Sequence, residues 1–297
     1  MSSSVLSRLA ARSNTLRFAA RYARNLNSPY WRSATLAIDG PAFYKRRIWK
    51  HYLTPDPAFQ PIPLSPEFQG YLQGLHEDGI VSITGHFEPV AARLRSLIDE
   101  MALTDFRRQD NVVDWVLDVG FVVPQVMQML SHPQLCGLFC NFYGRQAYYR
   151  EHPMMSATSS GAAGVDISSS HVHCDGYRQL TFMLLLNDVS DNDTHLIYYA
   201  GSQKIPKLNY ERVDATSRLV AGDRAVLGTG RAGTLLVFDA GSGYHKGRYL
   251  PGQRQLLQGV VTTGWLPFRD PTREDSGALL ASRATQPAYV RAMFDRD

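Results

Sequence analysis

The sequence predicts a mainly β protein with flanking helices, built around a double-stranded β-helix, the jelly-roll, cupin-like core. From Ala147 onward the chain consists of short apolar segments separated by turns, without helical periodicity between them. The strand candidates are 180–189, 196–200, 234–239 and 255–265. Consecutive short strands without intervening helices are typical of sandwiches and jelly rolls and not of parallel α/β sheets.

The region before Ala147 is expected to supply the flanking helices. Ser65-Pro66-Glu67 combines an N-cap hydroxyl, a proline at the first helical position and an acidic first turn, which is typical of a helix start. We expect this helix to end at Glu77, because Asp78-Gly79 follows. The other expected elements are a strand at 80–83, helices at 88–102 and 123–143, and a helix near the C-terminus.

Basic charge is concentrated at the N-terminus. Residues 1–38 hold six arginines, no lysine and no acid, whereas residues 39–297 carry 25 basic and 27 acidic side chains. Such an acid-free, Arg- and Ser-rich stretch is typical of a mitochondrial transit peptide and also of a basic helical arm. We favour the arm, and we expect the proline-rich residues 39–64 to wrap around the domain. The expected organisation is therefore an arm and wrapping segment, 1–64, and one domain, 65–297, in the cytoplasm or, alternatively, in mitochondria.

Composition excludes several classes of function. The nearly neutral body lacks the clustered basic stripe of a nucleic-acid-binding face, and no apolar stretch approaches the roughly 18–20 residues of a membrane-spanning helix. Three cysteines do not make a disulfide framework, and Cys136 and Cys140 share one helix face, where we expect buried thiols. The expected partner is a small molecule, and the sequence leaves the oligomeric state open.

Four residues on or beside the expected strands form an ordered set: His173, Asp175, His245 and Arg254. Residues i and i+2 of a strand point to the same side, so His173 and Asp175 can bind one ion, to which a later strand can bring His245. Two imidazoles and one carboxylate with open positions form the facial triad of non-haem Fe(II) oxygenases. The Arg254 guanidinium can pair with a carboxylate, as the far end of a 2-oxoglutarate co-substrate requires.

Two neighbouring residues compete for these roles. His171 shares a strand face with His173, but only His173 is followed two residues later by a carboxylate, so we favour His173 as the ligand. Arg248 lies in an expected turn after His245 and would face substrate or solvent. We favour Arg254, which begins a strand, as the partner of the carboxylate.

Other polar segments receive different interpretations. Arg178 would lie at the pocket mouth or on the surface, and His195 is expected to be structural. Residues 156–170 are small and polar, so we expect a mobile loop and a candidate lid. The G-x-G-x-x-G at 228–233 precedes a strand, so it is expected to be a turn and not a dinucleotide-binding fingerprint.

Two long stretches resemble the phytanoyl-CoA dioxygenase group of Fe(II)/2-oxoglutarate oxygenases. They are HVHCDGYRQLTFMLLLNDVSDNDTHLIYYAGSQK, at 171–204, and RAGTLLVFDAGSGYHKGRYLPGQRQLLQGVVTTGW, at 231–265. The earlier stretch PEFQGYLQGLHEDGIVSITG, at 66–85, is similar to the opening of that family. The resemblance spans residues 65–267.

This resemblance implies that His173, Asp175 and His245 ligate Fe(II) and that Arg254 holds 2-oxoglutarate. It implies a dioxygenase that uses O2 to hydroxylate, or otherwise oxidise, a C–H bond of a small organic or specialised-metabolite substrate. The chain departs from the family at 193–195, where an Asn-Gly or similar turn is usual, and at Gln203, where histidine is common.

Two other functions are compatible with the same residues. A non-catalytic jelly-roll module could keep the metal and 2-oxoglutarate sites for binding alone. A cupin-type metalloenzyme could work without 2-oxoglutarate, in which case Arg254 would have no role.

Overall fold

The computed structural model describes residues 55–100, 113–118, 124–149, 154–158, 170–176, 179–204, 211–213, 224–250, 254–263 and 286–294. Three of the sequence-based expectations lie outside these ranges. They concern the basic arm at 1–38, most of the expected loop at 156–170, and Arg178.

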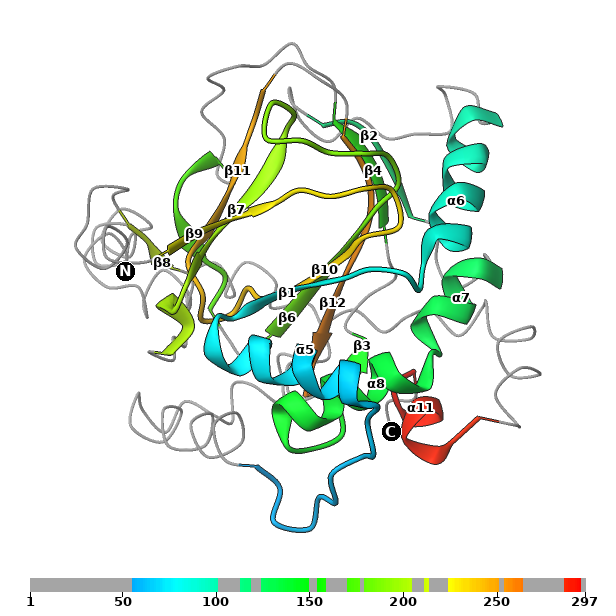
Figure 1. The fold of residues 1–297 in the computed structure, drawn as a ribbon, viewed down its shortest axis with the longest axis vertical. Helices are drawn as coiled ribbons and strands as arrows, with labels where there is room; N and C mark the ends of the chain where they lie inside the picture. Colours follow the sequence, from blue (N-terminus) through cyan, green and yellow to red (C-terminus); the bar gives the residue numbers. More distant parts are fainter. Residues whose placement is uncertain are drawn as a thin grey trace, which may run out of the picture.

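Two antiparallel sheets form the core and lie opposite each other (Figure 1). In the described part of the chain, the larger sheet has the order β1 (Ile80–Ile83), β10 (Leu235–Asp239), β6 (Gln179–Leu185), β12 (Arg254–Thr262), β4 (Met154–Thr158) and β2 (Val113–Asp118), with β3 (Tyr148–Tyr149) beside β12. The smaller sheet has the order β8 (Glu211–Arg212), β5 (His173–Cys174), β11 (His245–Arg248), β7 (His195–Ala200) and β9 (Arg224–Gly228). Because β5, β6 and β7, and then β10, β11 and β12, alternate between the sheets, the predicted jelly roll is confirmed.

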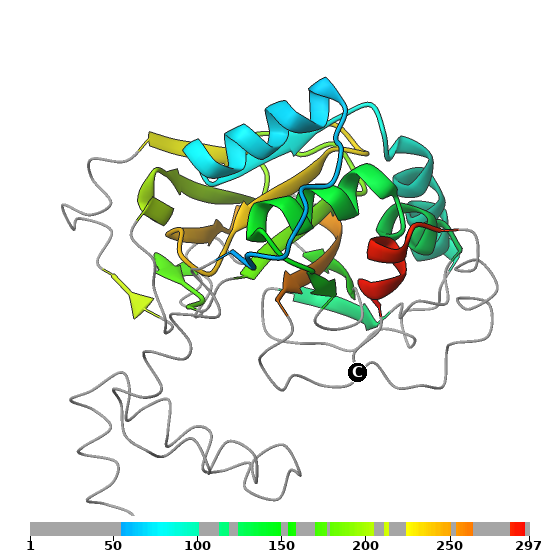
Figure 2. The ribbon, with the colours of Figure 1, turned by 90° about the horizontal axis from the view of Figure 1, so that it is seen from below.

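The helices pack on the outer face of the larger sheet, away from the smaller sheet (Figures 1 and 2). They are α5 (Pro66–Glu77), α6 (Glu88–Glu100), α7 (Pro124–Leu130), α8 (Pro133–Tyr143) and α11 (Ala288–Ala292). As the sequence predicts, α5 begins after Ser65, whose hydroxyl accepts a hydrogen bond from the Phe68 N–H.

The segment 123–143, which we expected to be helical, contains two helices, because α7 ends before His132 and α8 starts at Pro133. His132 has an extended backbone, with φ −63° and ψ 118°. The helical conformation is disfavoured for a residue before proline, because that residue clashes with the proline ring. The single apolar stretch therefore forms two helices.

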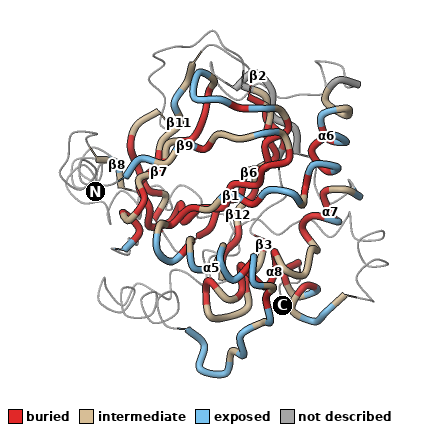
Figure 3. Tube along the Cα trace, in the orientation of Figure 1, coloured by how far each residue is buried: buried red, intermediate tan, exposed pale blue. Residues whose placement is uncertain are grey.

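Strand β6 lies at the centre of the core and is buried on both faces (Figure 3). Its outward side chains, Leu180, Phe182 and Leu184, pack with the helices. The side chains of Met183 and Leu185 point the other way and pack toward the smaller sheet. This two-sided burial explains why the sequence of β6 is largely apolar instead of strictly alternating.

The described residues before α5 run along α8. The Asn141 side chain bonds both the N–H and the carbonyl of Ile62, at 2.8 Å each. Gly144 ends α8 in a left-handed conformation with φ 63°, and its carbonyl accepts the Asp56 N–H at 2.9 Å. This part of the expected wrapping segment is therefore fixed to the helical layer.

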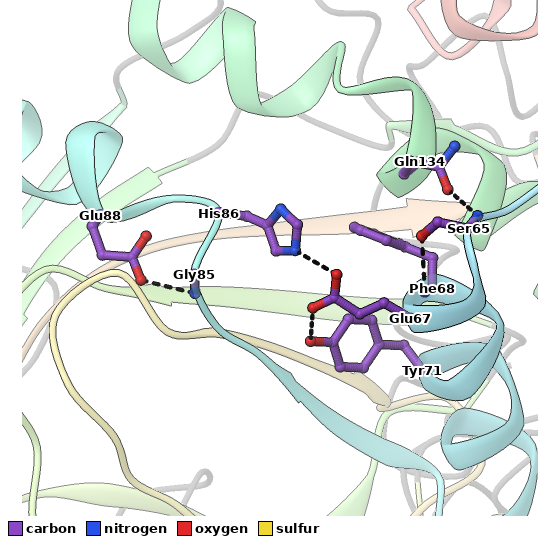
Figure 4. A network of polar contacts seen from close by, with 8 residues as sticks. All are labelled: Ser65, Glu67, Phe68, Tyr71, Gly85, His86, Glu88 and Gln134. Atoms are coloured by element: carbon purple, nitrogen blue, oxygen red, sulfur yellow. Dashed lines mark hydrogen bonds and ion pairs between the residues drawn. The ribbon is translucent and has the colours of Figure 1, made fainter.

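Polar contacts join α5 to the turn that follows β1 (Figure 4). The Glu67 carboxylate lies 3.2 Å from His86 Nε2 and accepts the Tyr71 hydroxyl at 2.9 Å. In the same turn, the Glu88 carboxylate accepts the Gly85 N–H at 2.8 Å. These bonds hold the start of α6 against α5, beside the edge strand β1.

Several short strands were not expected from the sequence. Residues 156–158 belong to β4, so the expected loop is wrong there. The small residues Ser156, Ala157 and Thr158 give no strand signal, and the pairing of β4 with β2 and β12 fixes their conformation. The glycine-rich 228–233 forms the predicted turn between β9 and β10, with φ 93° at Gly233.

The cysteines match their expected role as buried thiols. Cys136, Cys140 and Cys174 are all free and buried. Burial raises the pKa of the Cys140 thiol to about 11 and raises that of Cys136 further. None of the described helices has the length and apolar character needed to cross a membrane.

Candidate metal centre

The structure brings together three of the four predicted site residues. His173 on β5 and His245 on β11 are register partners in the smaller sheet. Asp175 follows β5, and one potential ligand atom from each of the three residues lies within 4.8 Å of the others. Within the described ranges, this is the one group of three or more such residues close enough to hold a metal ion.

The backbone orients both imidazoles. Nδ1 of His173 lies 2.7 Å from the carbonyl of His171, and Nδ1 of His245 lies 3.0 Å from the carbonyl of Gly243. A carbonyl only accepts hydrogen bonds, so each Nδ1 carries the proton and donates it. In the neutral rings Nε2 is then the unprotonated nitrogen, which is the arrangement that metal-binding histidines use.

Asp175 is held by both its main chain and its side chain. Its N–H donates to the carbonyl of Ala240 at 2.8 Å, and its Oδ2 accepts the Nε2–H of Gln179 at 2.7 Å. Its other oxygen, Oδ1, lies 3.7 Å from Nε2 of His173. The Asp175 side chain is 34% exposed, compared with 10% for His173, so the carboxylate marks the more open side of the site.

Apolar packing surrounds His245. The edge of Phe238 meets its ring at a centroid distance of 5.3 Å, and Tyr198 is its register partner on β7. Burial lowers the pKa of His245, and the nearby Asp175 carboxylate opposes part of this shift. The imidazole is therefore neutral at pH 7 and has its lone pair available for a metal.

Gly243 makes room for this packing. A side chain at position 243 would overlap the phenol of Tyr198. The same residue supplies the carbonyl that orients His245. The absence of a Cβ at position 243 thus lets Tyr198 pack against the residue whose carbonyl orients the His245 ring.

Arg254, the fourth predicted residue, begins β12 and points between the two sheets. It lies two residues before Leu256, whose register partner Leu185 packs on the inner face. Arg254 is only 9% exposed, and its Nε is buried without a hydrogen-bond partner. Burial lowers its pKa, and the described residues place no carboxylate within ion-pair distance of it. A buried cation with an unpaired donor is costly, so this position fits an anionic ligand.

The competing residues occupy other places. His171 accepts a hydrogen bond from Arg212 at 2.7 Å through Nδ1, and its carbonyl orients His173. Arg248 is exposed, and its register partner on β7 is His195. Its side chain lies on the face of β11 opposite to that of His245. The buried His195 binds the carbonyl of Asp193 through Nδ1, at 2.7 Å.

One departure from the family pattern has a structural role. The buried Gln203 donates to the carbonyls of His76 and Glu77, at 3.4 and 3.1 Å, and accepts the Gly201 N–H at 3.0 Å. It therefore caps the C-terminal end of α5.

Two residues near the site were not identified from the sequence. Gln179 binds Asp175, and its signal was a polar side chain at the start of an otherwise largely apolar strand. Tyr249 packs its ring over Gly247, where an added Cβ would lie 2.9 Å from its Cε2 atom. A side chain at 247 would point to the same side as His245, so Tyr249 lies on the inner face.

No family model and no curated protein matches the chain, but several solved structures do. SnoN, a non-heme alpha ketoglutarate dependent epimerase from nogalamycin biosynthesis, matches with 15% identity over 69% of this chain and 87% of that chain, at a TM-score of 0.52. EctD from S. alaskensis, with 2-oxoglutarate and 5-hydroxyectoine, matches with 14% identity over 81% and 90%, at 0.53. The carbocyclase SnoK from nogalamycin biosynthesis matches with 16% identity over 73% and 90%, at 0.50. The chain therefore has the jelly-roll fold of these alpha ketoglutarate dependent proteins.

Proposed function

We propose that this protein is a non-haem Fe(II)- and 2-oxoglutarate-dependent dioxygenase. One arrangement carries the proposal: two facing imidazoles and a carboxylate at one position, with a buried guanidinium on the inner face of the opposite sheet. Two imidazoles and one carboxylate are the protein ligands of the iron facial triad. The fold shared with SnoN and EctD supports the same interpretation.

His173 and His245 would bind Fe(II) through Nε2, and Asp175 through a carboxylate oxygen. Arg254 would pair with the distal carboxylate of 2-oxoglutarate, which would supply the anion that its unpartnered Nε lacks. Iron with 2-oxoglutarate and O2 supplies the oxidising chemistry, with succinate and CO2 as co-products. The protein contributes the spacing of these groups and apolar walls, such as Phe238 beside His245, that exclude water.

For the substrate, we propose a small organic molecule, with a specialised metabolite favoured. Among the oxygenases we favour the phytanoyl-CoA dioxygenase family, and the resemblance of 171–204 and 231–265 to it supports this choice. SnoN is an epimerase, SnoK is a carbocyclase, and EctD was solved with 5-hydroxyectoine. Hydroxylation is the default reaction for this chain, and desaturation, epimerisation and ring closure are its variants.

Succinate formation tests the proposal. Purified full-length protein, given Fe(II), 2-oxoglutarate and air, is expected to produce succinate slowly even without substrate. The His173→Ala variant is expected to produce none above the protein-free background. If succinate does not exceed that background with the unaltered protein, under any panel of candidate substrates, the site serves binding or a reaction without 2-oxoglutarate.

A further inference from the structure

A buried amide controls the orientation of the Asp175 carboxylate. Gln179 is 5% exposed, and its Nε2–H donates to Oδ2 of Asp175 at 2.7 Å. The other oxygen, Oδ1, is the one that lies 3.7 Å from Nε2 of His173. The amide thus engages one carboxylate oxygen, while the second faces the imidazole.

The main chain of Gln179 is fixed from two sides. Its Cα is in register with Thr262 of β12, and its carbonyl accepts the Gly241 N–H at 3.1 Å. Gly241 follows Ala240, whose carbonyl accepts the N–H of Asp175. One short segment therefore anchors the backbones of both residues, so their side chains have a defined separation.

A buried amide in a largely apolar strand is costly unless its polar atoms are paired. We propose that Gln179 is a positioning residue, which holds Asp175 as a metal ligand through Oδ1 alone. This inference rests on the metal site of the proposed function and adds to it the residue that sets how the carboxylate binds.

One-oxygen binding has a direct consequence for the open positions. In six-fold coordination, two histidines and one carboxylate oxygen leave three positions, two for 2-oxoglutarate and one for O2. If Asp175 bound through both oxygens, it would occupy one of these three. By engaging Oδ2, Gln179 keeps the third position available.

Calorimetric titration of the metal-free full-length protein with Ni(II) tests this role, because it requires neither 2-oxoglutarate nor turnover. Gln179→Met keeps the length of the side chain and removes the donor, and Gln179→Leu is a second variant of the same kind. Loss of a partner that orients a ligand typically lowers metal affinity about 10- to 100-fold, and we expect a loss in this range for both. Gln203→Met, which removes another buried amide, is the matched control and is expected to retain the affinity.

A double-mutant cycle separates positioning from general damage. If Gln179 acts through Asp175, Gln179→Met in an Asp175→Ala background should change Ni(II) affinity by less than about twofold. An equal loss in both backgrounds, or no loss beside an intact Asp175, would overturn the inference. So would a wild-type protein that binds no Ni(II). Nickel binding with the expected cycle, but without any 2-oxoglutarate binding, would retain the role of Gln179 and remove the proposed oxygenase function.

Discussion

His173 and His245 face each other across neighbouring antiparallel strands, with their ring centroids 4.4 Å apart. In each ring, Nδ1 binds the backbone carbonyl of the residue two positions earlier. The two histidines thus have the same local geometry, although they lie far apart in the sequence. Both Nε2 atoms are left for a shared ion.

Replacing His245 by alanine should remove metal binding. Loss of a residue that only orients a ligand lowers metal affinity by up to about 100-fold, and loss of the ligand itself should lower it further. Nickel calorimetry on the purified variant measures the effect. His195→Ala is the matched control, because His195 is also buried and also binds a carbonyl two residues earlier. Equal losses in the two variants would contradict the assignment of His245.

Replacing Arg254 by methionine should weaken 2-oxoglutarate binding and leave metal affinity unchanged. Truncating one partner of a buried charged pair costs about 2–5 kcal/mol, so the concentration of 2-oxoglutarate for half-saturation should rise by about 30-fold or more. Succinate formation as a function of 2-oxoglutarate concentration gives this value. Arg248→Met removes an exposed arginine and should change this concentration little. A larger rise in Arg248→Met than in Arg254→Met would instead assign the binding of the carboxylate to Arg248.

Replacing Gly243 by alanine should disturb the site through packing alone. The new methyl group would overlap the Tyr198 phenol, and over-packing of a core typically costs about 1–3 kcal/mol of stability. Because the carbonyl of Gly243 orients His245, metal affinity should fall as well. Thermal unfolding and nickel titration measure the two effects. Combining Gly243→Ala with Tyr198→Phe removes part of the overlap, so it should restore part of the stability and part of the metal affinity. If neither recovers, the overlap with Tyr198 is not the cause of the losses.

Replacing His132 by phenylalanine should reduce the acid sensitivity of the fold. Burial and the nearby His86 lower the pKa of His132, whereas an unfolded histidine has a pKa of about 6.5. The stabilising contribution is therefore present above about pH 6.5 and is lost as the pH falls through the lower folded value. Phe68 and Phe87 surround the ring, so phenylalanine should fit. Melting temperatures at pH 7 and pH 5 should differ less in the variant, and an unchanged difference would place the sensitivity elsewhere.

The jelly roll and the meeting of His173, Asp175 and His245 were readable from the sequence because their signals are local or ordered along the chain. The segment 180–186 is apolar except for Thr181 because β6 is buried on both faces. The spacing of His173 and Asp175 places both side chains on one side of an extended segment. Ser65 and Pro66 likewise mark the start of α5 by chemistry confined to one helical turn.

Features that depend on tertiary contacts were not readable. The small residues 156–158 belong to a strand only because β4 pairs with β2 and β12. His195 has the same hydrogen bond as His173 and His245, so position in the fold, and not local pattern, separates it from the two proposed ligands. Gln179 was missed because nothing in the strand pattern of β6 indicates that its first side chain binds a carboxylate four residues earlier.

The central claim is that His173, Asp175, His245 and Arg254 together bind Fe(II) and 2-oxoglutarate. Anaerobic addition of 2-oxoglutarate to the Fe(II)-loaded protein, followed by visible absorption, tests it most directly. We predict a weak charge-transfer band that saturates at one 2-oxoglutarate per protein in the unaltered chain and is absent in His245→Ala. A featureless spectrum from the unaltered, iron-loaded protein at saturating 2-oxoglutarate would contradict the claim.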